Sequence, residues 1–215
     1  AGFSIVSYTG TGSNMTIGHG LGAVPDLMIF KIRNSADNWA VWHKSFAVNQ
    51  YVYLNNTTAK ATVSTFMNGT LPTSTLISLG SWATVNYTAS HNYIAYCFAE
   101  KEGYSSFGSY TGNGSADGPF IYTGFRPAFV MFKRTDSSYG ADWILLDTAR
   151  DTYNSMLKRL NPNGSNAENA TAANLVDYTS NGFKIRSTLA GMNTNGGTFI
   201  YMAFAENPFK NSNAR

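Results

Sequence analysis

Few residues in this chain have the type and spacing that catalysis or metal binding requires. His19, His43 and His91 have no partner histidine two or four positions away, so their spacing does not predict a zinc site. Cys97 is the single cysteine, which excludes an internal disulfide and a zinc site built on several cysteines. No Gly-x-Ser-x-Gly nucleophile motif occurs. We therefore predict that the chain binds no metal ion and needs no cofactor.

The acidic residues are the next candidates for chemistry. Four aspartates gather in the second half of the chain: Asp136, Asp142, Asp147 and Asp151. Loop carboxylates can bind calcium, but these spacings do not fit a twelve-residue calcium loop, so solvated loops are the better interpretation. Glu100 and Glu206 stand at matching strand ends, which favours structural pairing over a glycosidase acid pair. No catalytic residue is predicted, and we expect a protein that is not an enzyme.

The elements that position these residues repeat once along the chain. Four ordered blocks, residues 8–13, 25–31, 38–39 and 93–100, match residues 110–115, 127–133, 142–143 and 199–206. A period near 100 residues suits a complete small domain rather than a solenoid repeat. We therefore predict a tandem duplication, with the first unit at residues 1–103 and the second at residues 104–215. The alternative is one large sandwich whose two halves share a core.

Short apolar and aromatic segments predict strands rather than helices. Leu27–Ile32 and Phe129–Phe132 are typical of buried strands, and Thr198–Phe204 is an aromatic strand near the end of the second half. Asp147–Leu160 is expected to form a short helical turn that leads into a strand. The strand spacing favours antiparallel sandwiches over βαβ units. We predict an all-β fold of two tandem homologous antiparallel β-sandwich units, jelly-roll or lectin-like.

The composition narrows the range of partners. Charged residues make up 13% of the chain and the formal net charge is +3, without a basic run, so we predict no nucleic-acid binding. No apolar stretch approaches the 18 or so residues that a membrane-spanning helix needs, so we predict no membrane insertion. Aromatic residues reach 14%, which argues against disorder.

A ligand site carried by one unit must lie where the two units differ, because shared positions serve the fold. Three loops stand out: Ser81–His91, Arg134–Asp142 and Arg186–Gly197. Within them, Trp82 and Tyr139 offer stacking faces for a ligand ring. Asp136 and Asn193 can bind sugar hydroxyls. We predict these four as ligand-binding residues, against the alternative that the loops have simply drifted or contact neighbouring subunits.

Several blocks of the sequence resemble a domain that recurs in tailed bacteriophages, especially marine ones. The blocks are Tyr93–Glu100, Gly108–Gly114, Lys133–Asp136 and Tyr201–Phe209. The domain is common in tail-fibre-like and other virion proteins, and the resemblance covers nearly the whole chain. It implies a location on the phage particle surface, with other virion proteins as partners, and it carries no catalytic residues.

These observations leave three hypotheses. The first is a tail-fibre or receptor-binding module that contacts host surface polysaccharide, where many weak sites in a homo-oligomer give strong adhesion. The second is a capsid or tail decoration protein that stabilises the particle. The third, an enzyme that acts on glycan, is the weakest because no acid pair or nucleophile is legible. The position in the virion and the host receptor are left open by the sequence.

Overall fold

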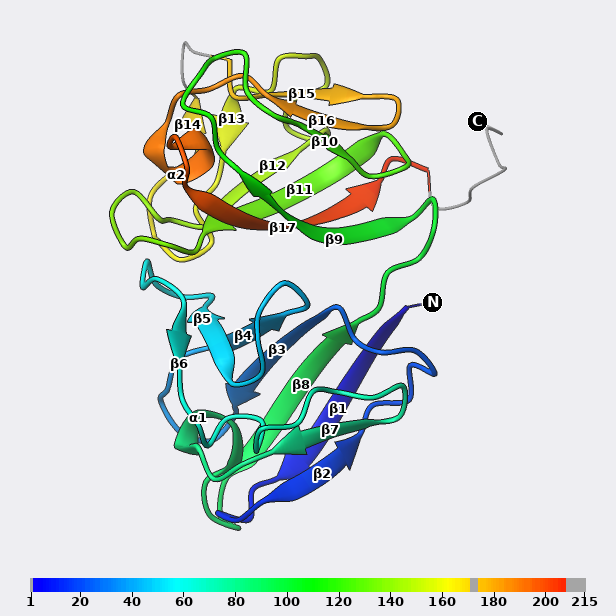
Figure 1. Cartoon of the computed structure of the whole chain (residues 1–215), viewed down its shortest axis with the longest axis vertical. Helices are drawn as coiled ribbons and strands as arrows, with labels where there is room; N and C mark the ends of the chain where they lie inside the picture. Colours follow the sequence, from blue (N-terminus) through cyan, green and yellow to red (C-terminus); the bar gives the residue numbers. More distant parts are fainter. Residues whose placement is uncertain (1, 171–173, 208–215) are drawn as a thin grey trace. The chain divides into compact units, whose positions relative to one another are not determined.

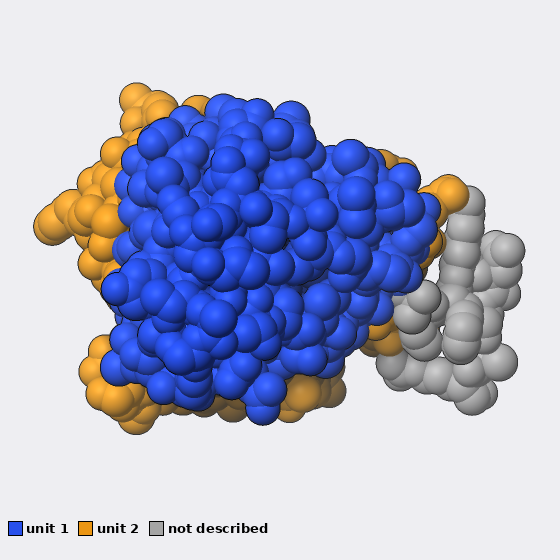
Figure 2. Space-filling view, turned by 90° about the horizontal axis from the view of Figure 1, so that it is seen from below, with its two compact units in different colours: residues 1–55, 60–100 blue, residues 56–59, 101–215 orange. Residues whose placement is uncertain are grey.

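The computed structural model describes residues 2–170 and 174–207. The chain divides into two compact units, coloured separately in Figure 2. Unit 1 comprises residues 1–55 and 60–100, and unit 2 comprises residues 56–59 and 101–215. The main boundary therefore lies between Glu100 and Lys101, close to Gly103. Among the described residues, no helix is both long enough and apolar enough to span a membrane.

Unit 1 is built on a six-stranded antiparallel sheet (Figure 1). Its strands lie in the order β1 (Phe3–Thr9), β8 (Asn92–Phe98), β3 (Leu27–Ile32), β4 (Ala40–His43), β5 (Gln50–Tyr53) and β6 (Ala61–Thr62). A two-stranded sheet of β2 (Met15–Gly18) and β7 (Leu76–Leu79) forms a second layer, and the short helix α1 (Ala83–Asn86) follows β7.

The core of unit 1 lies on the inner face of its large sheet. Met28 and Phe30 alternate onto this face of β3 and are fully buried. The Phe66 and Phe30 rings pack edge to face, with 5.8 Å between their centroids. Cys97 is paired opposite Met28 on β8, and burial raises the pKa of its thiol to about 12. The cysteine is therefore a packing residue and remains a thiol at neutral pH.

Unit 2 contains two larger antiparallel sheets (Figure 1). One has the order β12 (Ile144–Asp147), β11 (Pro127–Arg134), β17 (Thr198–Ala205) and β9 (Ser105–Thr111). The other has the order β10 (Phe120–Tyr122), β16 (Gly182–Ile185) and β15 (Val176–Thr179). The unit also contains the pair β13 (Lys158–Arg159) and β14 (Asn169–Ala170), and the helix α2 (Ala190–Asn193).

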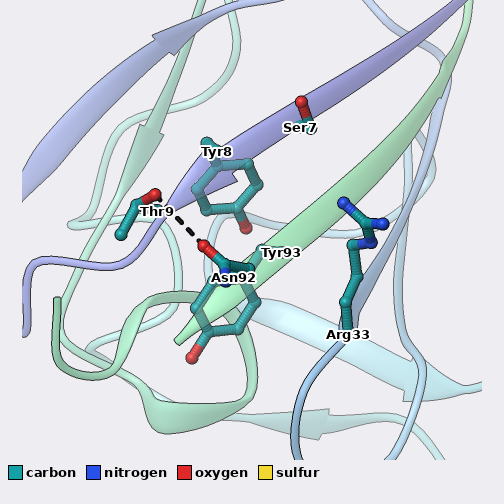
Figure 3. A pocket seen from close by; sticks show the side chains of 6 residues that line it. All are labelled: Ser7, Tyr8, Thr9, Arg33, Asn92 and Tyr93. Carbon is teal, nitrogen blue, oxygen red and sulfur yellow. Dashed lines mark hydrogen bonds between the residues drawn. The ribbon is translucent and has the colours of Figure 1, made fainter. Parts of the chain in front are cut away.

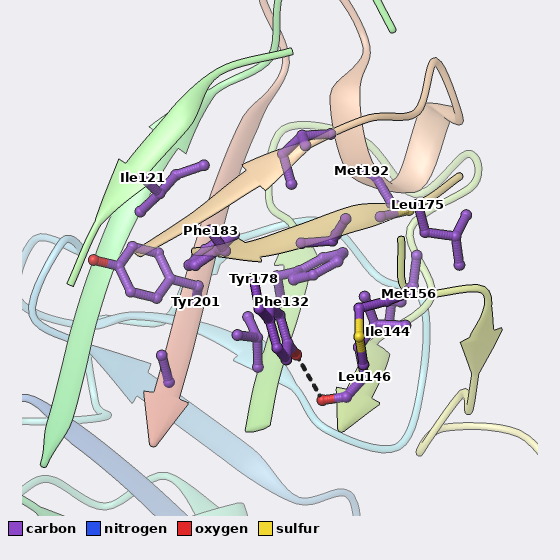
Figure 4. Packing of buried hydrophobic residues seen from close by; sticks show 14 of the residues in the cluster. Ile121, Phe132, Ile144, Leu146, Met156, Leu175, Tyr178, Phe183, Met192 and Tyr201 are labelled. Carbon is purple, nitrogen blue, oxygen red and sulfur yellow. Dashed lines mark hydrogen bonds between the residues drawn. The ribbon is translucent and has the colours of Figure 1, made fainter. Parts of the chain in front are cut away.

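One apolar cluster joins the two sheets of unit 2 (Figure 4). Val130 and Phe132 project from β11, and Tyr178 and Phe183 project from the facing sheet, all fully buried. The Tyr178 hydroxyl donates to the carbonyl oxygen of Leu146 at 3.0 Å, so the buried phenol has a partner. The packing confirms the predicted all-β, antiparallel sandwich fold.

The two units have the same strand order in their main sheets. In unit 1 the order runs β1-β8-β3-β4, and in unit 2 it runs β9-β17-β11-β12. The predicted strands Leu27–Ile32 and Phe129–Phe132 therefore occupy equivalent places, in β3 and β11. The pair β2–β7 has its counterpart in β10–β16, and each unit has one short helix before its last strand. This correspondence supports tandem duplication, which stays a prediction.

Residues 147–160 form one turn that leads into a strand, as predicted, with the N–H of Asp151 donating to the carbonyl oxygen of Asp147 at 3.2 Å. Strand β12 ends at Asp147, a turn follows, and the chain re-enters a strand at Lys158. The Asp151 carboxylate accepts the backbone N–H groups of Leu157 and Lys158, both at 2.6 Å. The aspartate thus holds a loop by bonding the backbone groups that a helix would use.

Candidate functional site

A cluster of partly buried aromatic side chains lies on unit 1. The Trp82 ring centroid is 4.5 Å from that of Tyr51 and 6.3 Å from that of Tyr53. Phe66, fully buried, lies beneath them at 5.3 Å from Trp82. The three outer side chains are each partly exposed. We call Tyr51, Tyr53 and Trp82 the aromatic platform.

Local structure explains how these rings come together. Tyr51 and Tyr53 are two positions apart on β5, so both side chains lie on the same face of the sheet. Trp82 immediately precedes α1, and its backbone N–H donates to the carbonyl oxygen of Thr65 at 3.0 Å. The Gly80 N–H donates to the carbonyl oxygen of Phe66 at 2.8 Å. Any side chain at Gly80 would collide with the Thr65 carbonyl oxygen. Backbone contacts therefore fix the position of Trp82.

Polar groups border the platform. Burial raises the pKa of Tyr53, and its hydrogen bond to Tyr51 raises it further, so the phenol stays protonated and able to donate. Asn38 also hydrogen-bonds Tyr53, and the Asn38 side-chain oxygen accepts from the Asn55 amide at 2.9 Å. Flat aromatic faces beside amide and hydroxyl groups can stack on a sugar ring and bond its hydroxyls.

The corresponding place in unit 2 has different residues. Leu189 precedes α2 as Trp82 precedes α1. The N–H of Trp143 donates to the Asn163 side chain at 2.7 Å, as the N–H of Trp39 does to Asn55 at 3.0 Å. This match aligns Arg159 and Asn161 with Tyr51 and Tyr53. The aromatic platform is therefore a feature of unit 1.

The structure places Asn193 in the framework rather than at a ligand site. Its side chain is fully buried at the end of α2, and its amide donates to the carbonyl oxygens of Ser115 at 2.7 Å and Ser187 at 3.0 Å. Its oxygen accepts the N–H of Asn113 at 2.8 Å. Because each bonding group of this buried amide already has a partner, the expectation that Asn193 contacts a ligand is wrong.

Asn86 at the end of α1 performs the same task in unit 1. Its side-chain oxygen accepts the N–H of Thr11 at 2.7 Å. Its side-chain amide donates to the backbone carbonyl oxygens of Ser13 at 2.6 Å and Gly80 at 2.8 Å. Each short helix thus clamps the glycine-containing turn that follows the first strand of its unit. We call Asn86 and Asn193 the paired amide clamps.

Asp136 also serves the framework. Its carboxylate pairs with the Arg134 guanidinium through two bonds of 3.1 and 3.0 Å and accepts the N–H of Thr198 at 2.9 Å. The hydrogen bond from Arg134 holds the pKa of Asp136 below its ordinary value. In unit 1, Asn34 accepts the N–H of Asn92 in the same way, at 2.9 Å. Asp136 is therefore a shared position, contrary to its predicted place in an unmatched loop.

Tyr139 and Trp82, the two aromatic candidates, differ in their surroundings. Tyr139 is 79% exposed, whereas Trp82 packs within the platform. Trp82 lies in unit 1 and the other three candidates lie in unit 2, so the four do not form one site within either unit. Among residues 2–170 and 174–207, no group of three or more His, Cys, Asp or Glu side chains is placed to hold a metal ion.

Sequence comparison finds one related family. A family model described as "Domain of unknown function (DUF7483)" matches residues 1–208, which include parts of both units. No curated protein and no solved structure matches the chain significantly.

Proposed function

We propose that this chain, which belongs to the DUF7483 family, is a non-enzymatic carbohydrate-binding module on the surface of a bacteriophage particle. In this role it contacts host surface polysaccharide as part of a tail fibre or other receptor-binding structure. The observation that carries the carbohydrate assignment is the aromatic platform of unit 1. The resemblance of the sequence blocks to tailed-phage virion domains supports the location.

The chemistry of the platform fits a neutral sugar face. Sugar rings present C–H groups on one face, which pack on aromatic rings, and hydroxyls at their edge, which need donors and acceptors. Tyr51 and Trp82 supply the faces, and Tyr53 with Asn38 supplies polar groups. Such sites are weak singly, and a homo-oligomeric fibre multiplies them into firm adhesion.

The test is binding of the purified chain to polysaccharide extracted from host cells. Trp82→Ala removes the largest ring of the platform, and we expect it to reduce binding by about two- to thirteenfold, the effect of losing about 0.5–1.5 kcal/mol of stacking. Leu189→Ala is the matched control, because Leu189 has the same position before the helix of unit 2. Equal binding by wild type and a folded Trp82→Ala variant would refute the assignment.

The location on the particle is tested separately from sugar binding. Antibody labelling of purified particles, viewed by electron microscopy, distinguishes the tail from the capsid. Label at the tail tip supports the receptor-binding role. Label spread over the capsid lattice supports the decoration role instead, and particles without label contradict both virion roles.

A further inference from the structure

Unit 1 carries a small polar pocket where β1, β8 and the end of β3 lie side by side (Figure 3). Its volume is about 160 Å³, and its lining residues are Ser7, Tyr8, Thr9, Arg33, Asn92 and Tyr93. Pockets for drug-sized ligands measure roughly 300–1,000 Å³. The pocket is therefore smaller than a drug-sized site, and its ligand is at most a single sugar residue or a comparable small group.

The polar side chains of the pocket share one face of the sheet. Thr9 and Asn92 are paired directly across β1 and β8, and the hydroxyl of Thr9 donates to the Asn92 side chain at 3.3 Å. The backbone N–H of Arg33 donates to the Asn92 carbonyl at 2.7 Å, which puts Arg33 opposite Asn92. Ser7 lies on the same face of β1 as Thr9 because two positions separate them.

The Arg33 guanidinium is available for a ligand. Arg33 is exposed, and within the described residues no carboxylate lies at ion-pair distance from it. Arg134 and Arg150, by contrast, are each paired with a nearby aspartate. A planar guanidinium matches the two oxygens of a carboxylate, which makes Arg33 an anion-binding group beside hydroxyl and amide partners.

Unit 2 lacks this charge at the equivalent place. The N–H of Thr135 donates to the Thr198 carbonyl at 2.8 Å, as Arg33 does to Asn92. The Thr135 and Thr198 hydroxyls bond each other at 2.9 Å. The fold therefore accepts a small neutral residue here, and the backbone pairing does not require an arginine.

We propose that this pocket binds the carboxylate of an acidic sugar residue such as a uronic acid. Arg33 pairs with the carboxylate, and Ser7, Thr9 and Asn92 bond the sugar hydroxyls. The site uses none of the residues of the aromatic platform. Its ligand is a charged sugar, whereas the platform stacks on the face of a sugar ring, so each site can be tested without the other.

The experiment is a titration of the intact chain followed by NMR of its backbone amides. With D-glucuronate, the amide signals of Ser7, Thr9 and Asn92 should shift. The equivalent signals of Ser109, Thr111 and Thr198 in unit 2 should not move and serve as an internal control. D-Glucuronamide, the neutral analogue, should bind at least about tenfold more weakly, because a hydrogen bond to a charged group is lost.

Arg33→Gln removes the charge while keeping a polar side chain of similar shape, and it should weaken glucuronate binding at least about tenfold. An unchanged amide spectrum elsewhere verifies its fold, and Leu189→Ala, in unit 2, should leave the titration unaltered. Equal binding by Arg33→Gln, or no shift at Ser7, Thr9 and Asn92, overturns the proposal. Acetate that produces the same shifts at the same concentration overturns the assignment to a sugar.

Discussion

Trp82 and Leu189 occupy the same position, one residue before a short helix that ends in a clamping asparagine, yet their surroundings differ. Trp82 faces two tyrosines on β5, whereas the corresponding strand positions in unit 2 hold Arg159 and Asn161. The carbonyl oxygens of both residues accept the same helix bonds, from Val85 and Asn86 in unit 1 and from Met192 and Asn193 in unit 2. The comparison teaches that the framework constrains its bonded positions and leaves neighbouring surface positions free to acquire a function.

The strongest challenge to this comparison is to remove the paired amide clamps. Asn193→Ala leaves the N–H of Asn113 and the carbonyl oxygens of Ser115 and Ser187 without their partner. Asn86→Ala does the same in unit 1. We expect each change to cost about 3 kcal/mol, because buried groups lose their hydrogen bonds. Urea unfolding of both variants measures this, and a large loss at one clamp but not the other would break the equivalence.

A smaller loss of stability is expected when Asp136 loses its charge. Asp136→Asn keeps an acceptor for the Thr198 N–H but loses the charge that pairs with Arg134. We expect a loss of about 1 kcal/mol at neutral pH, the upper range for an ion pair near the surface, because the Arg134 side of the pair is buried. The equivalent position in unit 1 is the neutral Asn34, so the fold itself should survive the change.

The pH dependence of this loss follows from the pKa of Asp136, which lies below 3.8 in the folded chain. The stabilisation from a lowered carboxyl pKa is present above the unfolded value and disappears as pH falls through the folded value. The melting temperatures of wild type and Asp136→Asn should therefore differ most near pH 7 and converge only when the pH falls below the lowered pKa of Asp136 in the folded chain. A difference that persists unchanged at acid pH would contradict the ion pair.

The smallest expected effect is at Tyr139. Because this side chain is 79% exposed, Tyr139→Ala should change the free energy of unfolding by less than about 0.5 kcal/mol. Calorimetry measures this, and polysaccharide binding measured on the same sample sharpens the comparison between the units. Binding that depends on Tyr139 and not on Trp82 would move the site from unit 1 to unit 2.

The fold could be predicted from the sequence because strands have local sequence patterns. Proline before an apolar run marked β3 and β11, and matched blocks marked equivalent elements in the two halves. The turn after β12 and the strand that follows it were also predicted, but only the structure shows the Asp151 carboxylate accepting backbone N–H groups there. Whether a side chain bonds nearby backbone groups depends on three-dimensional geometry, which the spacing of residues along the sequence does not show.

The sequence predicted only part of the aromatic platform. Trp82 was found because nothing aromatic matches it in the second half, but its partners Tyr51 and Tyr53 lie on a strand about 30 residues earlier, beyond any local pattern. The sequence alignment did not pair Asn193 with Asn86 or Asp136 with Asn34, so these shared positions were placed in loops that differ between the units. Those equivalences appear in the hydrogen bonds, since an amide clamp can be recognised only by what it bonds.

The most direct test of the central claim is a crystal structure of the intact chain grown with an oligosaccharide derived from host surface polysaccharide. The account predicts a sugar ring stacked on Tyr51 or Trp82 in unit 1, with its hydroxyls bonded near Tyr53 and Asn38. A sugar ordered around Tyr139 in unit 2, with the aromatic platform bare, would contradict it.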